Sequence, residues 1–454
     1  MKGSLPYDKA DQASILAYAR KIIGRSLRQA VPTTPKAKSG HKGGLGNLLE
    51  EFYFLYKPNP LPRPDFYEAG LELKATPVKK ITKGYRAKER LVLNKIDFKE
   101  EYQRTFRTSS FLVKNEALLL LFYLYEKDIV NLDYVFKYAD IWKYSELDLK
   151  IIEDDWNKIV EKIKAGKAHE ISEGDTNYLG ACTKGATAES SKTDQPFSSI
   201  KAKGRAFALK QTYVNHILEQ FIQREAKRKV GASEKLVANV AQYSSGQSFE
   251  DLILKKFTKY YGKTFEEIAD SFGDIDITRN AKNRFSDLSK RILGVRGKRI
   301  EEFEKANITL RTIRLNTNGM PEEAISLPSF KYKEIIKEEW ETSDFREQLD
   351  KRFLFVFFQF DEDKRLVLHK AMFWNMPYQD IEGGAKKVWL ETVRRIKAKK
   401  AHDLPKEGDK EFGICHVRPH ARDRDDTDLT HYGANLVKKC FWLNKAYIAA
   451  VFKS

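Results

Sequence analysis

The feature that most constrains the fold is an internal duplication, because the same order of short motifs runs twice along the chain. The segment Ala69–Thr76 is answered by Ala306–Ile313, and Trp156 by Trp389, each in a similar setting. Self-similarity of this kind indicates repeated structural units. A module of about 220 residues is within the usual size of a domain. We therefore predict two tandem domains, residues 1–229 and 234–454, with a linker at Val230–Ser233.

Each copy alternates strand-like and helix-like segments. Ala117–Tyr125 is a continuous apolar run of strand length, which is typical of a strand in the middle of a sheet. After it, Trp156, Ile159 and Ile163 recur at helical spacing. We therefore predict an α/β (α+β) fold in which helices flank a mixed sheet. Further elements are expected as helices at Ile15–Ile23, at Leu45–Tyr56 and from near Phe207, and as a short strand at Tyr178–Cys182.

One stretch of the first copy places two carboxylates and a lysine close together. From Leu71 on, apolar residues alternate with Glu72 and Lys74, so a strand sends both side chains out of one face. Pro77 is expected to end this strand. Asp65 lies seven residues before Glu72, and a turn between them would bring the two carboxylates together. The local pattern fits a metal site and an exposed strand edge with a Glu-x-Lys ion pair equally well.

The second copy is an internal control for this stretch. In the first copy Glu50, on the helix predicted before the stretch, adds a third carboxylate. The second copy loses most of this acidic character. Since three acids would converge from separate elements in the first copy alone, we favour the metal site over the exposed edge. Between the copies, Asp65 faces Glu302, Glu72 faces Thr309, Lys74 faces Arg311, and Glu50 faces Lys290.

The charge of the chain favours a polyanionic partner. Its 454 residues include 82 Lys and Arg against 64 Asp and Glu, a formal net charge of +18. Proteins that neutralise nucleic-acid phosphates gain affinity from the release of counterions. A basic protein without such a partner is the alternative, because charge by itself does not exclude it.

Cysteine content and hydropathy argue against secreted and membrane classes. The three cysteines are an odd number without Cys-x-x-Cys spacing, which argues against a disulfide framework and a structural zinc site. The N-terminal residues lack the apolar core of a signal peptide, and no apolar run reaches the roughly 18 residues of a membrane span. We expect a soluble, cytoplasmic protein that does not bind a membrane.

An acidic cluster of this composition suits a hard divalent cation. Magnesium is typically held by one or two carboxylates together with a substrate phosphate, and it activates a bound water. Lys74 could orient or deprotonate that water and offset the charge that develops in the transition state. Together with the basic charge, this predicts Mg²⁺-dependent hydrolysis of phosphodiester bonds in a nucleic acid.

The spacing of Asp65, Glu72 and Lys74 is the Asp…Glu-x-Lys signature of the restriction-endonuclease-like fold. With Lys42–Glu50 and Ala69–Pro77 as its setting, the first copy resembles the mismatch-repair nicking enzyme MutH, and the second copy shows the same resemblance more faintly. Two MutH-like modules in one chain resemble the GATC-cutting type II restriction endonucleases of this family. The resemblance implies a catalytically silent, DNA-binding effector as the second module.

The resemblance also implies roles for single residues. Glu50, Asp65 and Glu72 would hold the metal, and Lys74 would serve catalysis. Lys42 and Lys114 would lie near the scissile phosphate, and Lys184 would read base edges; for these three an ordinary solvated lysine is the alternative. The further DNA contacts it implies are Thr108, Ser109, Lys210, Arg418 and Lys445.

The chain departs from the family pattern in two places. Cys182-Thr183-Lys184 stands where the family has Arg-Pro-Lys in the DNA-reading loop, whereas the second copy keeps Arg418-Pro419-His420. The residue after Phe207 is Ala208, and its counterpart is Trp442. Both departures bear on which sequence the first module reads.

We expect a type II restriction endonuclease that cuts double-stranded DNA at GATC with Mg²⁺. It would need no obligate protein partner and would act as a monomer that pairs or loops on DNA with two sites. The alternatives are a MutH-like nicking enzyme of mismatch repair and, from another class, a DNA-binding regulator with an inactive nuclease fold.

Overall fold

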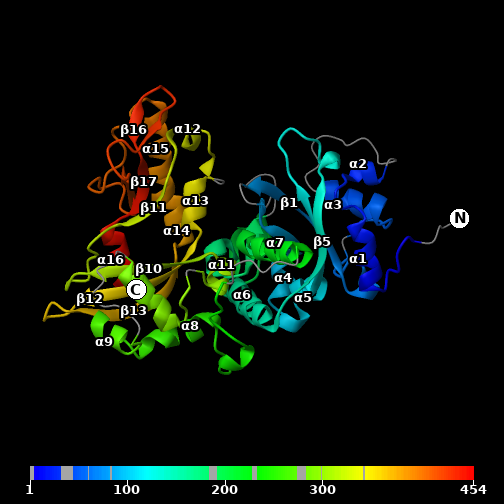
Figure 1. Ribbon diagram of the computed structural model, residues 1–454, viewed down its shortest axis with the longest axis horizontal. Helices are drawn as coiled ribbons and strands as arrows, with labels where there is room; N and C mark the ends of the chain where they lie inside the picture. The colour runs from blue at the N-terminus through cyan, green and yellow to red at the C-terminus, as the bar shows by residue number, and fades with distance from the viewer. Residues whose placement is uncertain are drawn as a thin grey trace. The chain divides into compact units, whose positions relative to one another are not determined.

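The computed structural model describes residues 5–31, 44–59, 61–81, 84–183, 192–226, 233–273, 283–297, 299–340 and 343–453. The chain forms two compact units, which follow one another from blue to red in Figure 1. Unit 1 comprises Met1–Ile171, Asp175–Gln242 and Arg299–Ala306, and unit 2 comprises Ser172–Gly174, Tyr243–Lys298 and Asn307–Ser454. Within the described residues, no helix is both long and apolar enough to span a membrane.

The main sheet of unit 1 has four strands in the order β2-β1-β4-β5. β1 (Glu72–Ile81) pairs in parallel with β4 (Ala117–Leu124), while β2 (Gly84–Ala87) and β5 (Phe136–Lys143) are antiparallel to their neighbours. β4 is buried from Ala117 to Phe122, because it lies between two strands and both of its faces are covered. The prediction of a central strand in this apolar run is confirmed.

Helices cover both faces of this sheet. Leu119 and Leu121 of β4 share a core cluster with residues of α1 (Gln12–Arg20), α2 (Leu27–Ala30) and α3 (Gly44–Leu48). On the opposite face Phe122 packs edge-on against Phe221 of α7 (Gln211–Ala226), with ring centroids 5.7 Å apart. The alternation of side chains along β4 thus fixes which helix packs on which face.

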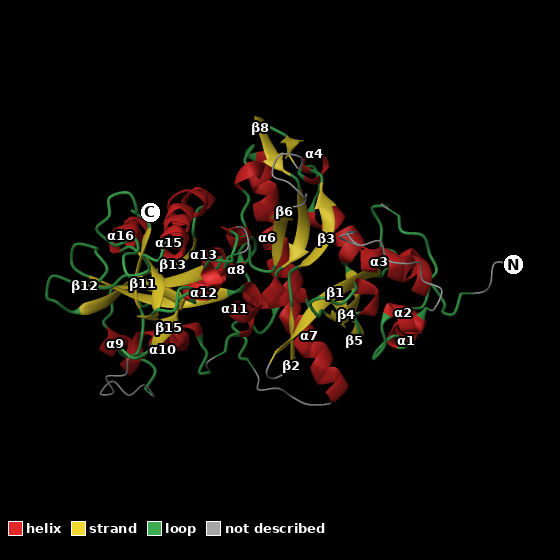
Figure 2. Cartoon of the chain, turned by 90° about the horizontal axis from the view of Figure 1, so that it is seen from above, coloured by secondary structure: helices red, strands yellow, loops and turns green. Residues whose placement is uncertain are grey.

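A second sheet completes unit 1. Its strands are β3 (Leu91–Ile96), β9 (Arg205–Leu209) and β6 (Leu179–Thr183) in the order β3-β9-β6, and α6 (Glu146–Lys164) lies beside β6 (Figure 2). A hairpin of β7 (Lys192–Gln195) and β8 (Ser198–Lys203) extends the unit. The remaining short helices before unit 2 are η1 (Leu49–Tyr53), η2 (Tyr67–Ala69), α4 (Phe98–Glu101), η3 (Phe106–Thr108), α5 (Ser110–Asn115), η4 (Asn131–Asp133), η5 (Ala168–Glu170), η6 (Glu173–Asp175) and η7 (Val240–Gln242).

Unit 2 repeats the strand order of unit 1. β10 (Ile308–Leu315) pairs in parallel with β12 (Arg352–Phe360), which pairs antiparallel with β13 (Leu366–Asn375), as β1, β4 and β5 do. Its second sheet, β11-β17-β14, matches β3-β9-β6. The other strands and the helices are β11 (Ile325–Ser329), β14 (Cys415–Pro419), β15 (Thr427–Leu429), β16 (Asn435–Val437), β17 (Lys439–Leu443), α8 (Phe249–Thr258), α9 (Phe265–Asp270), α10 (Arg284–Leu293), α12 (Tyr332–Ile335), α13 (Asp344–Leu349), α14 (Tyr378–Asp380), η9 (Ile381–Ala385), α15 (Lys386–Lys397) and α16 (Lys445–Lys453). The predicted α/β class with two tandem modules is confirmed.

Two predicted boundaries are wrong. The helix expected from near Phe207 begins at Gln211, because Arg205–Leu209 form the buried central strand β9. Pro77 does not end β1, which continues to Ile81. The register of β2 with β1 ends at Val78, and the carbonyl of Pro77 accepts from Lys88 N at 2.9 Å just beyond it, so the proline lies at the end of this pairing, where its missing N–H is tolerated.

The helix α11 (Glu301–Ala306) belongs to unit 1, although the predicted boundary assigns residues 234–242 and 299–306 to the second domain. Lys305 is 6% exposed, and its Nζ lies 2.9 Å from Asp148 Oδ1 and 2.8 Å from Glu301 Oε1. The same ammonium lies over the rings of Tyr178 and Tyr213, at 5.8 and 5.9 Å from their centroids. This buried ion network holds α11 on the first unit.

Lys305→Met is expected to destabilise unit 1 by about 3–5 kcal/mol, since it leaves the buried Asp148 carboxylate without its cation. Urea unfolding of the full chain measures the change. Lys9→Met, which breaks an exposed ion pair with Glu68, is the control and should have a much smaller effect. Equal effects of the two substitutions would contradict the role of Lys305 as a buried anchor.

Candidate active site

A tight turn brings Asp65 and Glu72 together. Phe66 and Leu71 exchange backbone hydrogen bonds of 2.9 and 3.2 Å around η2, and Gly70 adopts φ +66°, a left-handed conformation that favours glycine. Leu73 N donates to Asp65 Oδ2 at 3.0 Å, and Asp65 N donates to Glu72 Oε2 at 3.2 Å. The seven-residue spacing therefore places the two carboxylates side by side.

Glu72 is a buried carboxylate with two lysines beside it. It is 1% exposed, and the Nζ of Lys74, on the same face of β1, lies 2.6 Å from its Oε1. Lys114 of α5 places its Nζ 3.5 Å from the same oxygen and donates to Leu61 O at 3.3 Å. The alternative of a solvent-exposed strand edge is excluded by the burial of Glu72.

Glu50 faces this pair from η1, a π-helical turn that continues α3. Leu49 and Tyr53 of this turn are buried and anchor it in the core, so Glu50 is held toward the site. Burial, followed by the charge of Asp65, raises the pKa of Glu50 to about 7. Burial likewise raises the pKa of Glu72 to about 7, against the opposing effect of Lys74. The protein around the site thus stabilises the ionised forms of Glu50 and Glu72 less well than bulk water does.

The donor set fits a divalent cation of the magnesium type. Carboxylate oxygens are its preferred ligands, and one or two of them suffice when a substrate phosphate and waters complete the shell. Asp65 and Glu72 supply such a pair, and a bound cation would counteract the burial, and the lesser effect of neighbouring carboxylates, that raise the pKa of Glu50 and Glu72. The described residues contain no recorded group of three or more acidic, histidine or cysteine ligands, and the role of Glu50 as a third ligand stays a prediction.

Tyr56 borders the site and is a residue that sequence reasoning missed. Its hydroxyl is buried and has no hydrogen-bond partner among the described residues. Its ring packs edge-on against Phe66, next to Asp65, with centroids 5.4 Å apart. Burial, together with the charges of Asp65 and Glu50, raises the pKa of Tyr56 well above its usual range. In the sequence this residue ends an aromatic run, Phe52–Tyr56, that is typical of a core.

Three residues of unit 1 that the resemblance assigns to DNA contact make hydrogen bonds within the protein. Ser109 is fully buried and caps α5, its Oγ accepting from Leu112 N at 3.0 Å. Thr108 is exposed and forms a capping box with Thr105. Lys210 is buried and donates to the carbonyl of Thr176. Their roles in DNA binding stay predictions, and Lys42 and Lys184 lie outside the described residues.

The implied DNA contacts of unit 2, Arg418 and Lys445, are half-buried. Arg418 of β14 stacks its guanidinium over the ring of Trp442 at 3.7 Å from the centroid. Such stacking holds an arginine in a fixed orientation while its N–H groups remain able to donate. Lys445 is half-buried at the start of α16.

In the second copy, the residues aligned with the acidic site make different interactions. The carboxylate of Glu302 accepts hydrogen bonds from Leu236 N at 3.0 and 2.9 Å and from Val237 N at 3.1 Å, within unit 1. Lys290 Nζ pairs with Asp287 Oδ1 at 3.1 Å. Thr309 and Arg311 replace Glu72 and Lys74 on β10. Only the first copy therefore assembles the two carboxylates and the lysine.

Tyr56→Phe is expected to leave the free energy of unfolding unchanged or to raise it, since it removes a buried hydroxyl that has no partner. Tyr7→Phe is the matched control: the Tyr7 hydroxyl donates to Phe54 O, and its loss should cost about 1 kcal/mol. Chemical denaturation of both variants measures the difference. If Tyr56→Phe were the more destabilising of the two, the hydroxyl would have a partner that the structure does not describe.

Comparisons with known proteins agree with this geometry. The family model described as DNA mismatch repair enzyme MutH matches residues 54–155 and 295–382, one segment in each half of the chain. The first segment contains Asp65, Glu72, Lys74 and Lys114, and the second contains Thr309 and Arg311.

The curated relatives match either the whole chain or half of it. The type II restriction enzyme Sau3AI of Staphylococcus aureus is 35% identical over 459 residues, covering 94% of this chain and 91% of that protein. The DNA mismatch repair protein MutH of Shewanella woodyi is 25% identical over 221 residues, 47% of this chain and 94% of its own length. MutH of Vibrio campbellii is 27% identical over 219 residues, 46% of this chain and 92% of its own length.

A complete MutH therefore corresponds to about half of this chain, as expected if one module has been duplicated. The predicted family and the predicted endonuclease class are both confirmed by the match to Sau3AI over nearly the full length. The chain belongs to the MutH-like family of restriction-endonuclease-fold nucleases, and within it to the type II restriction endonucleases.

Proposed function

We propose that this endonuclease hydrolyses phosphodiester bonds of double-stranded DNA at GATC with Mg²⁺, and that unit 1 performs the chemistry. The observation that carries the proposal is the pairing of Asp65 and Glu72 with Lys74, 2.6 Å from Glu72, in unit 1. The GATC specificity is supported by the resemblance to the tandem MutH-like restriction enzymes. The net charge of +18 supports a nucleic-acid substrate.

The residues of unit 1 divide the reaction among them. Asp65 and Glu72 would hold Mg²⁺, which when bound supplies an activated water and charge stabilisation at the phosphorus. Lys74 orients or deprotonates the attacking water and offsets the charge that develops on the phosphate oxygens. Lys114, whose Nζ lies 3.5 Å from the same Glu72 oxygen as Lys74, would place a second ammonium near the scissile phosphate. Glu50 would contribute from η1, directly or through a water, to the same or a second ion.

Unit 2 has a separate task in this proposal. It keeps the strand order of unit 1 but not the acids, so it would bind a second copy of the recognition site without cutting it. The second site would act as an effector, and the protein would pair or loop DNA that carries two sites. The partner is double-stranded DNA, and no protein partner is required.

The purified full chain, incubated with Mg²⁺ and an unmethylated plasmid, is expected to make discrete double-strand cuts whose sequenced ends lie at GATC. A plasmid with two sites should be cut faster than one with a single site, because unit 2 then has its own duplex. A plasmid without GATC is the control. Single-strand nicks would instead favour the repair activity, binding without cleavage would favour a regulator, and equal rates on one and two sites would remove the effector role.

A further inference from the structure

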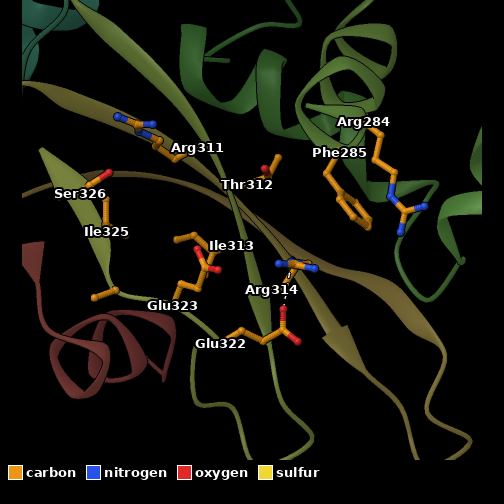
Figure 3. Close-up of a pocket in the computed structure, with 11 residues that line it drawn as sticks. Arg284, Phe285, Arg311, Thr312, Ile313, Arg314, Glu322, Glu323, Ile325 and Ser326 are labelled. Atoms are coloured by element: carbon orange, nitrogen blue, oxygen red, sulfur yellow. Dashed lines mark ion pairs between the residues drawn. The ribbon is translucent and has the colours of Figure 1, made fainter. Parts of the chain in front are cut away.

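Unit 2 contains a cleft of about 370 Å³ whose lining includes Arg311, the counterpart of Lys74 (Figure 3). Its walls are formed by α10, by β10 and by the segment that leads into β11. Three arginines, a serine and two glutamates line it: Arg284, Arg311, Arg314, Ser326, Glu322 and Glu323.

The cleft exists because two strands part. A bridge between Leu315 and Pro321 joins the end of β10 to the segment before β11. The two strands otherwise belong to different sheets: β10 pairs with β12, and β11 pairs with β17. In the described part of the chain β10 has β12 as its one strand neighbour in its sheet, so its other edge faces the cleft. Arg311 lies on this strand at the position that Lys74 occupies on β1.

The arginines of the cleft differ in how they are held. Arg314 Nε is paired with Glu322 Oε2 at 3.0 Å (Figure 3). The guanidinium of Arg284 lies over the rings of Phe265 and Phe285, 5.1 and 4.9 Å from their centroids. Glu323 is the second carboxylate on the wall, so three arginines face two glutamates and one positive charge is left over.

Among the described residues, Arg311 is held neither by a recorded ion pair, as Arg314 is, nor by stacking on aromatic rings, as Arg284 is. No ion pair or hydrogen bond of its guanidinium is recorded with any residue that the structure describes, although the surrounding protein lowers its pKa by desolvation. Its side chain remains accessible from the cleft, as does that of the half-buried Ser326 of β11. The guanidinium of Arg311 is exposed and has no recorded acceptor in the described part of the chain, so its N–H donors are available to an incoming anion.

We propose that Arg311, with the hydroxyl of Ser326, binds a phosphate group of the DNA backbone in this cleft and holds it uncut. The inference rests on the proposed function of unit 2 as a module that binds a second duplex. A guanidinium matches the oxygens of a phosphate with two parallel N–H donors, which a lysine does not. In unit 1 the corresponding strand offers Lys74 beside Glu72, whereas Arg311 has Thr309 as its neighbour on the same face.

Two observations favour a phosphate over a metal ion in this cleft. Thr309 and Lys290 stand where the first copy has Glu72 and Glu50, so ligands have been replaced by a neutral and a cationic group. Of the two glutamates on the wall, Glu322 is already paired with Arg314. The lining residues that the structure describes thus offer arginine donors without a cluster of free carboxylates, which suits a phosphate better than a cation.

The test uses the full chain with Glu72→Gln and no added metal, so that the DNA stays intact. The probe is a short duplex with one GATC site, titrated at several chloride concentrations. The parent is expected to bind two duplexes, and adding Arg311→Gln should weaken the second binding event roughly tenfold, the worth of one charged hydrogen-bonded contact. The slope of log affinity against log salt for that event should fall by about one.

The matched control is Arg365→Gln in the same background. It removes the same charge from unit 2, but Arg365 is 61% exposed and paired with Asp361 and Asp363 at the turn between β12 and β13. If the unfolding midpoints of both variants equal that of the parent, folding is retained. The variant Arg311→Lys keeps the charge but loses the paired donors, so it should weaken the second binding event less than Arg311→Gln does.

The possible outcomes separate the inference from the function on which it rests. If the parent binds two duplexes and Arg311→Gln binds the second as tightly, with the same salt slope, the phosphate site is overturned and the effector role stands. If the parent binds a single duplex, the effector role itself fails and the inference falls with it. A selective loss of the second event in Arg311→Gln, but not in Arg365→Gln, would support the proposal.

Discussion

The buried carboxylate of Glu72 is the constraint on which the first unit depends. A carboxylate that is 1% exposed is costly unless donors and cations surround it. Those partners come from three places: the backbone of Asp65 across the η2 turn, Lys74 on the same strand, and Lys114 from α5. The turn, β1 and α5 are therefore held in one arrangement around a single charge. That arrangement leaves the neighbouring acid of Asp65 at the same point.

The two units show how one scaffold supports different chemistry. β1 and β10 occupy the same place in the same strand order, yet one presents Glu72 and Lys74 and the other Thr309 and Arg311. Glu302, the counterpart of Asp65, has become a buried acceptor for the amides of Leu236 and Val237. Function here lies in the residues placed on the fold and is independent of the fold itself.

Much of the fold could be predicted because its signals are local. The apolar run of β4, the helical spacing around Trp156 and the repeated motifs each follow from period and composition. The pairing of Asp65 with Glu72 followed from their spacing and from the strand that carries Glu72. The loss of these acids in the second copy also needed no structure.

The rest depends on contacts between distant residues. Arg205–Leu209 has the composition of a helix start, but pairing with β3 and β6 makes it a strand. Ser109 and Lys210 occupy positions that the family resemblance assigns to DNA contact. Both are buried, however: Ser109 caps α5, and Lys210 donates a hydrogen bond to a backbone carbonyl. The place of α11 in unit 1 is decided by Asp148, 157 residues away from Lys305. The unpartnered hydroxyl of Tyr56 and the cleft of Arg311 likewise become visible only once the strands are in place.

The central claim is that one of the two scaffolds carries the chemistry, and plasmid cleavage by the full-length Glu72→Gln variant tests it most directly. We expect the rate to fall by more than about a hundredfold while DNA binding is retained, since even residues that only orient the ligands of a metal contribute about tenfold to a hundredfold. Thr309→Val, at the matching position of unit 2, should cut within a few-fold of the parent. Cleavage by Glu72→Gln at the parental rate would contradict the account, because the cutting centre would then lie elsewhere in the chain.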